Sequence, residues 1–348
     1  MAPKKKDKKK KANEEPVLGE DPKVLLANYT KFCKAIGLEP HAQIKTQLED
    51  EEKDKIDQLV VSGNPGGGPP EPLGPGGTRA LATAILGNSD LMTGGPYKLL
   101  KALRIWNANV GDDGTQSLSE LLRLGGGDII LSYLELFDNN IGPRGCQALG
   151  SALSFGSNQS LLTLKLDYNI TIGAEGVVAL CRGLRTNRYL KQLHLAYCNI
   201  TPEAGAPLGD MLSYSGLGLV ILNLQGNRIS GVGLGGMCPG LARNRSLQFL
   251  SLADNGIGEI DGDEEHIRAF GASMIACETL THIDLLYNRI GEAGAKMLQP
   301  FLLPENTRIK QFLVDASLPE TYFASIFRRD TSGGKKKKKG KKGKKKKK

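Results

Sequence analysis

Leucines alternate with other residues in a pattern that recurs along most of the chain. One copy runs from Leu131 through Leu134 and Leu136 to Asn139, and the next copy begins at Leu161 with the same spacing. Alternating apolar side chains predict a short β-strand with one buried face. A repeat period of roughly 30 residues is typical of stacked repeat architectures. We therefore expect one elongated array of similar units rather than separate globular domains.

One position in each copy, three residues after the third apolar residue, sets the register of the array. An asparagine turned inward at this position can hydrogen-bond the backbone of adjacent coils, which would be costly to bury without partners. A cysteine in this row is interpreted as structural, because a thiol forms weak hydrogen bonds. The row is Asn64, Ala108, Asn139, Asn169, Cys198, Asn227, Asn255, Asn288 and Ser317.

The second half of each copy predicts a turn and a helix. Ile141 to Gly145 reads Ile-Gly-Pro-Arg-Gly, and an apolar helical spacing of Ala148, Leu149 and Leu153 follows. Glycine permits a tight turn where a Cβ would clash. The apolar stripe of the helix would cover the buried side of the strands.

These motifs resemble the leucine-rich repeat family, in its ribonuclease-inhibitor-like class. The resemblance covers about Ile56 to Ser317 and implies an α/β solenoid of about nine repeats. Family members form a curved horseshoe with parallel strands on the concave face and helices on the convex face.

The two ends of the array need covers, because a solenoid otherwise exposes its core. Asp21 as N-cap and Pro22 at the first helical position predict a helix that Gly37 closes, and a second helix follows Pro40. The expected organisation is a disordered basic arm (1–15), a helical cap (16–53), the repeat array (54–317) with a Gly/Pro-rich insertion (65–77), a C-terminal cap (318–333) and a disordered lysine-rich tail (334–348).

The net charge of +9 hides a strong contrast between the ends and the body. The two ends together carry 19 lysines and one aspartate, so the body holds 27 basic and 36 acidic residues and is acidic. The sequence has no apolar run long enough to span a membrane and no secretory signal. Six cysteines without a CxxC pair indicate reduced thiols in an intracellular protein.

No group of residues predicts catalysis. Gly231 to Gly236 satisfies GxGxxG, but its glycines fall on turn positions that are also glycine in neighbouring repeats. The acidic residues around Asp261 lack the ligand order of a calcium loop. The four histidines show no metal-ligand spacing. We expect no enzyme activity, no cofactor and no metal ion.

In the family, residues beside the core leucines line the concave face, and those after the third leucine lie at its edge. In this chain these positions gather aromatic and acidic side chains, a combination typical of protein interfaces. Stacking of neighbouring rings along the strands is the alternative explanation. The predicted partner-binding residues are Trp106, Tyr133, Glu135, Phe137, Asp138, Asp167, Tyr168, Tyr197, Asp254, Asp284 and Tyr287.

The lysine-rich ends predict binding to a polyanion. Nucleic-acid phosphates, a nuclear-import receptor and acidic tubulin tails or microtubule-associated proteins are the alternatives, besides simple solubilisation. Nucleic acid is disfavoured because the body is acidic and no aromatic side chain is interleaved with the lysines. The residues concerned are Lys4, Lys5, Lys6, Lys8, Lys9, Lys10, Lys11, Lys335, Lys336, Lys337, Lys338 and Lys339.

The combination of repeats, N-terminal helical cap and basic ends resembles leucine-rich repeat proteins of motile cilia. That resemblance implies a scaffold of the axoneme, in a radial spoke or dynein-regulatory complex, located in the cytoplasm and cytoskeleton, with the nucleus as the alternative. A GTPase activator of the Ran-activator type is the second candidate, with Arg104 on a strand, although that family has an acidic tail. A ribonuclease inhibitor proper is the third, although it is usually richer in cysteine.

Overall fold

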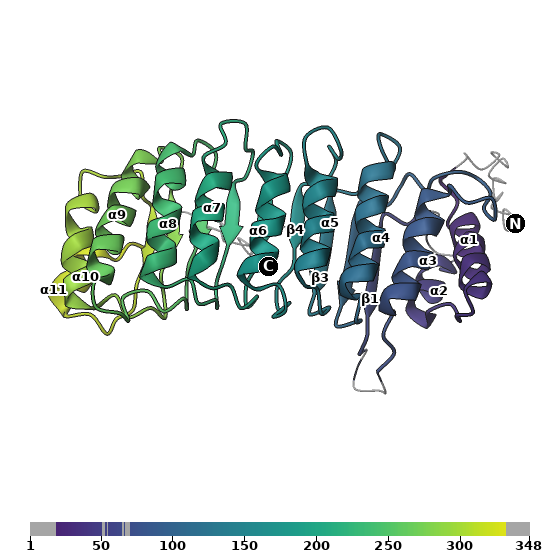
Figure 1. Cartoon of the computed structure of the whole chain (residues 1–348), viewed down its shortest axis with the longest axis horizontal. Coiled ribbons are helices and arrows are strands. Elements are labelled where there is room, and N and C mark those ends of the chain that lie inside the picture. Colours follow the sequence, from purple (N-terminus) through teal and green to yellow (C-terminus); the bar gives the residue numbers. More distant parts are fainter. Residues whose placement is uncertain (1–18, 51–52, 54, 65, 67–69, 332–348) are drawn as a thin grey trace, which may run out of the picture. The chain divides into compact units, whose positions relative to one another are not determined.

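The computed structural model describes residues 19–331 except 51–52, 54, 65 and 67–69. The chain divides into two compact units, the first ending at Thr171 and the second beginning at Ile172. Across the described residues nine parallel strands alternate with helices, so the predicted repeat fold is confirmed. Within each unit the helices lie on one side of the strands (Figure 1).

In the first unit, four strands pair in parallel register, which places Leu59, Leu103, Leu134 and Leu164 in one row. All four side chains are fully buried, as alternation predicts. The elements are α1 (Pro22–Ala35), α2 (Ala42–Leu48), β1 (Gln58–Ser62), α3 (Gly74–Leu86), β2 (Ala102–Trp106), α4 (Gly111–Leu124), β3 (Tyr133–Phe137), α5 (Pro143–Leu153) and β4 (Thr163–Lys165).

In the second unit, five strands repeat this arrangement, and a row from Leu193 to Phe312 is buried in the same way. The elements are α6 (Gly173–Leu184), β5 (Gln192–His194), η1 (Pro202–Ala204), α7 (Gly205–Leu212), β6 (Ile221–Asn223), α8 (Ser230–Arg243), β7 (Phe249–Ser251), α9 (Asp263–Ala276), β8 (His282–Asp284), α10 (Gly291–Leu298), η2 (Gln299–Phe301), β9 (Gln311–Leu313) and α11 (Glu320–Ile326).

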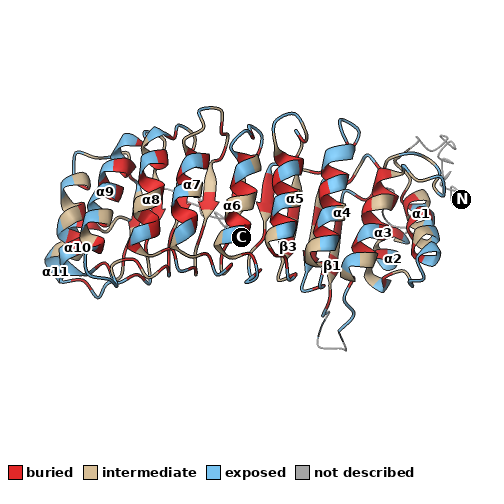
Figure 2. Ribbon diagram, viewed as in Figure 1, coloured by how far each residue is buried: buried red, intermediate tan, exposed pale blue. Residues whose placement is uncertain are grey.

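Helix burial follows the apolar stripe. In α5 the side chains of Cys146, Leu149 and Leu153 are fully buried, whereas Gln147 on another side of the helix is exposed. Figure 2 shows the same division along the helices of both units, with exposed residues on the outer side. The core of each unit therefore lies between its strands and its helices.

The asparagine row forms the hydrogen bonds that the sequence predicts. The Asn139 amide donates to the carbonyls of Ile105 (2.7 Å) and Phe137 (3.0 Å), and its Oδ1 accepts from the amides of Ala108 (3.0 Å) and Val110 (3.4 Å). Each ladder asparagine thus satisfies buried backbone groups of two coils. Asn169, Asn227, Asn255 and Asn288 are buried and bonded in the same manner.

Three positions of that row differ from the buried, bonded asparagines. Asn64 is exposed, so its assignment to the buried ladder was wrong; β1 is the first strand of the sheet, and no preceding repeat offers the backbone groups that the other ladder asparagines bond. Ser317, at the other end of the row, is exposed as well. Cys198 is fully buried, and its backbone amide donates to Asn227 Oδ1 at 3.0 Å.

A second row of asparagines lies in the loops before the strands, and the sequence reasoning missed it. Asn158 donates to the carbonyl of Leu122 (2.9 Å) and accepts from the amide of Leu161 (2.9 Å). In the second unit Asn244 makes the equivalent bonds: it donates to the carbonyl of Leu212 and accepts from the amide of Leu247. The loops are therefore tied by side-chain amides on both ends of the strands.

Helix α2 covers the edge strand β1, and α1 packs against α3. Asp21 caps α1, accepting from Lys23 N at 2.8 Å, as the sequence predicts. Helix α2 carries two glutamines whose amides pair with the strand backbone. Gln43 bonds both backbone groups of Ser62, and Gln47 bonds both backbone groups of Val60. These bonds occupy strand groups that would otherwise be free to pair with another chain.

The described chain after β1 differs from the expected insertion in one respect. Helix α3 begins at Gly74, so the last four residues of the predicted 65–77 insertion are helical.

At the C-terminal end, α11 leads to Arg328, whose backbone forms an antiparallel bridge with Phe312 in β9. The Arg328 guanidinium also donates to the carbonyls of Leu302 and Leu303, which fixes this segment over the last strand.

Candidate protein-binding face

The outward side chains of the strands form a face in each unit, here called the strand face. In the first unit, Arg104, Glu135 and Lys165 share one row of the register, and Trp106 is paired with Phe137 in the next. The fold therefore brings together seven predicted residues in this unit: Trp106, Tyr133, Glu135, Phe137, Asp138, Asp167 and Tyr168.

A polar cluster occupies the middle of the first strand face. The Arg104 guanidinium lies 4.5 Å from the centre of the Tyr133 ring, 3.5 Å from Glu135 Oε2 and 3.1 Å from Gln58 Oε1. The Tyr133 hydroxyl donates to Glu135 at 2.8 Å, and Lys165 lies 5.7 Å from the same ring. These contacts hold Arg104 against its own strand face.

Aromatic side chains follow the polar cluster at the carboxyl ends of the strands. Phe137 and Tyr168 contact each other with ring centres 4.8 Å apart and a tilt of 45°. Trp106 is 36% exposed and Tyr168 is 44% exposed. Large rings that stay this accessible are available as anchors for a partner.

The residue immediately before each ladder position, here called the rim position, adopts a left-handed backbone. Its φ is 65° at Tyr168, 55° at Tyr197 and 61° at Tyr287, and Gly226 stands at the same position in another repeat with φ 69°. Bulky side chains rarely adopt this conformation because Cβ approaches the following carbonyl. Tyrosine at the rim is thus unfavourable for the backbone itself.

In the second unit the predicted residues are more dispersed. The Tyr197 ring packs on Gly226, where a Cβ would overlap it, and its hydroxyl lies 3.3 Å from Gln225 Nε2. Tyr287 is 70% exposed, and Asp254 is exposed as well. Asp284 lies apart from these rim residues, inside the groove described next.

A shallow groove of about 240 Å³ crosses the second strand face, and sequence reasoning missed most of it. Phe249 and His282 stack in its floor with ring centres 4.3 Å apart. Burial raises the pKa of the Asp284 carboxyl, and nearby Asp315 adds to that shift. The alternation that selected Tyr133 also marks Phe249 and His282, because all three share the first outward position of their strands.

Comparison with known proteins agrees with this geometry. The sequence profile described as "Leucine Rich repeat" matches residues 130–150, 157–181, 186–209, 219–238, 243–259 and 276–298. These six segments of the chain are leucine-rich repeats. The repeats are ribonuclease-inhibitor-like: the ribonuclease inhibitor of Mus musculus is 28% identical over 160 residues. That match covers 44% of this chain and 34% of the relative, so the chain spans about a third of the relative's length.

Two solved structures are similar at lower levels. Leiomodin-1 actin-binding site 2 is 15% identical, with 45% of this chain and 88% of that chain covered and a TM-score of 0.36. The tropomodulin C-terminal domain of Caenorhabditis elegans is 12% identical, with 46% and 90% covered and a TM-score of 0.37.

A leucine-rich repeat array implies a protein-binding scaffold.

The glycine motif from Gly231 to Gly236 has a packing role. Gly233 and Gly236 lie within α8 rather than in a phosphate-binding loop. A Cβ on Gly236 would lie 2.8 Å from the backbone nitrogen of Ala206 in α7. These glycines therefore allow close approach of neighbouring helices.

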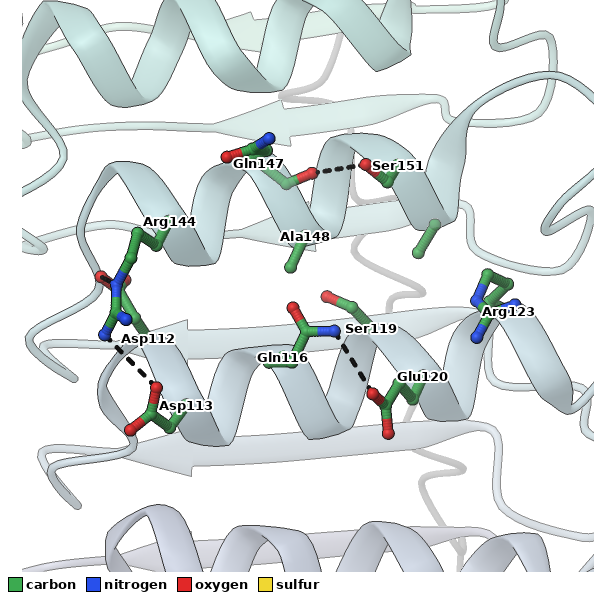
Figure 3. Close-up of a pocket in the computed structure, with 11 residues that line it drawn as sticks. Asp112, Asp113, Gln116, Ser119, Glu120, Arg123, Arg144, Gln147, Ala148 and Ser151 are labelled. Atoms are coloured by element: carbon green, nitrogen blue, oxygen red, sulfur yellow. Dashed lines mark hydrogen bonds and ion pairs between the residues drawn. The ribbon is translucent and has the colours of Figure 1, made fainter.

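The helix side of the first unit carries a polar cleft of about 490 Å³ between α4 and α5. Figure 3 shows its side chains paired among themselves, with Asp113 bonded to Arg144 and Gln116 to Glu120. Asp112 accepts from the amides of Gly142 and Gly145, which caps the start of α5. This pairing gives the cleft a structural explanation.

Among the described residues no group of three His, Cys, Asp or Glu side chains is placed to hold a metal ion. Within the same residues no helix is long and apolar enough to cross a membrane. All six cysteines are buried. The predicted polyanion-binding lysines, Lys4–Lys11 and Lys335–Lys339, lie outside the described residues.

Proposed function

We propose that the strand faces bind a partner protein and that the chain serves as a non-catalytic scaffold. The observation that carries this proposal is the exposed tyrosine at a left-handed rim position, above all Tyr287. Its ring is 70% exposed at φ 61°. Left-handed backbone costs an L-residue roughly 1–2 kcal/mol. A side chain that costs this much without being buried is better explained by binding than by stability.

Ring stacking, the alternative explanation of the aromatic side chains, accounts for part of the first unit only. The contact of Tyr168 with Phe137 is worth about 0.5–1.5 kcal/mol, which is similar to the backbone cost of the rim position. Trp106 retains an exposed ring beside this pair. Stacking and binding are therefore compatible for Tyr168, whereas the exposed Tyr287 supports the binding proposal.

We also propose that the lysine-rich ends tether the scaffold to a polyanionic assembly, with the axoneme of a motile cilium as the predicted location. This step rests on the charge contrast between the ends and the acidic body and on the resemblance described above. Tagged protein that is absent from isolated axonemes of ciliated cells would remove the ciliary part of the proposal. Removal of residues 1–15 and 334–348 should release the protein from the assembly while its folded units stay intact.

The GTPase-activating alternative depends on Arg104. An activating arginine must reach the phosphates of a bound nucleotide. Here its guanidinium is engaged by Tyr133, Glu135 and Gln58. This engagement favours a structural role for Arg104, and we therefore prefer the scaffold.

The scaffold proposal is tested by capture of partners from cells of the source organism. Full-length protein should recover a set of proteins that is lost when Trp106→Ala and Tyr287→Asn are combined. Arg123→Ala, on the helix side, is the matched control and should keep the set. Identical sets from the strand-face variant and the wild type would refute the proposal.

A further inference from the structure

The groove of the second strand face has an aromatic floor that is held in place. Phe249 is 37% exposed and stacks on His282. The His282 ring is fixed on both sides, with Nδ1 2.7 Å from Thr281 Oγ1 and Nε2 3.1 Å from Asp330 Oδ2. Because the supporting ring cannot rotate freely, the accessible face of Phe249 is preorganised for a flat ligand group.

One half-buried carboxylate lies beside this floor. Asp284 Oδ1 accepts from the amide of Leu286 at 3.0 Å, and no ion pair joins Asp284 to another described residue. The described lining of the groove contains no lysine or arginine. Its remaining members are aliphatic, hydroxyl, amide and imidazole side chains: His194, Ile221, Leu222, Asn223, Gln225, Leu250, Ser251, Ile283 and Gln311.

A ligand for this groove must therefore offer positive charge and a planar surface together. Guanidinium stacks on aromatic rings and forms paired hydrogen bonds with a carboxylate, whereas ammonium is a compact and strongly hydrated charge. Burial raises the pKa of Asp284, which means that the fold destabilises its ionised form. A bound cation would stabilise that form. The amides of Asn223 and Gln225 add hydrogen-bonding capacity beside the stack.

We propose that this groove is the binding site for an arginine side chain of the partner protein, with the guanidinium stacked on Phe249 and paired with Asp284. The inference rests on the proposed scaffold function, since it names the chemistry that one strand face recognises. A volume of about 240 Å³ suits a single long side chain inserted from a loop or an extended segment.

The test uses the full-length chain and three acetylated, amidated pentapeptides, Gly-Gly-X-Gly-Gly, in which X is arginine, lysine or citrulline. Citrulline keeps the planar shape of arginine without its charge. Binding is followed by the backbone amide resonances of β6, β7 and β8. The arginine peptide should give saturable shifts there, with affinity at least tenfold above citrulline and severalfold above lysine.

Two variants locate the site. Asp284→Asn should weaken the arginine peptide about tenfold and remove its preference over citrulline, and Phe249→Ala should weaken it severalfold. Asp210→Asn, an exposed carboxylate on α7 of the same unit, is the matched control and should leave affinity unchanged. Their spectra also verify that each variant is folded.

Shifts that fail to saturate, equal affinity for citrulline, or insensitivity to Asp284→Asn would overturn the arginine site. Equal affinity for lysine would overturn the guanidinium assignment. These outcomes are distinct from failure of the scaffold proposal. Partner capture that still depends on Trp106 and Tyr287 would preserve the scaffold, whereas loss of that dependence would refute it even if the peptide binds.

Discussion

Replacement of Asn139 by alanine is the most direct test of how the repeats are held together. The side chain makes four buried hydrogen bonds, two through its amide nitrogen and two through its oxygen. Each contributes about 1 kcal/mol net, and a buried group left without a partner costs about 1–3 kcal/mol. The substitution should therefore lower the free energy of unfolding by about 3–5 kcal/mol, a large share of the ~5–15 kcal/mol typical of a domain.

Trp106 supplies the measurement, because it is the only tryptophan of the chain and lies in β2, on a coil that Asn139 bonds. Urea unfolding followed by its fluorescence reports the first unit. Gln147→Ala is the matched control, since Gln147 is an exposed amide on α5 of the same unit; it should cost under ~1 kcal/mol. If Asn139→Ala proves no more costly than Gln147→Ala, the ladder does not stabilise the array as we argue.

Three further predictions concern rim strain, burial and charge. Tyr287→Asn should raise the unfolding free energy by up to ~1 kcal/mol, because asparagine tolerates left-handed backbone better; a loss measured by urea unfolding would contradict the strain argument. Burial raises the pKa of Cys146 to about 12, so iodoacetamide should label it only after denaturation, and native labelling seen by mass spectrometry would be inconsistent with the fold. Asp284 has a folded-state pKa above its unfolded value, so its ionised form destabilises the protein at neutral pH and protonation removes that penalty as pH falls through the folded pKa. Asp284→Asn should therefore be more stable than wild type at neutral pH, with a difference that shrinks toward acid pH in parallel urea titrations; a constant difference would refute this account.

Period and side-chain type were sufficient to predict the fold. The alternation of leucines fixes which side chains are buried, and the row at Leu134 and Leu164 is buried as expected. The asparagine row could be predicted because a single inward amide side chain can bond the backbone groups of two neighbouring coils. Both arguments depend on local spacing alone, so they hold without knowledge of distant contacts.

The ends of the array depend on contacts that spacing does not encode. The pairing of Gln43 and Gln47 with β1 joins segments that have no repeat relation to each other. A glutamine on a short helix carries no sign of its partner strand. The prediction that Asn64 is buried was wrong for a related reason. Its coil is the first of the array, so no preceding coil is present for its side chain to bond.

The candidate site was predicted as a set of positions but not as a shape. Spacing identified Asp284 as outward-facing, whereas its half-buried state depends on the neighbouring strands, where its register partners are Ser251 in β7 and Leu313 in β9. Strand register decides which side chains of different repeats touch, and that register places an aromatic floor beside a carboxylate. The two strand faces consequently differ in chemistry. In the first unit Arg104 forms an ion pair with Glu135, whereas no lysine or arginine lines the groove that holds Asp284 in the second unit.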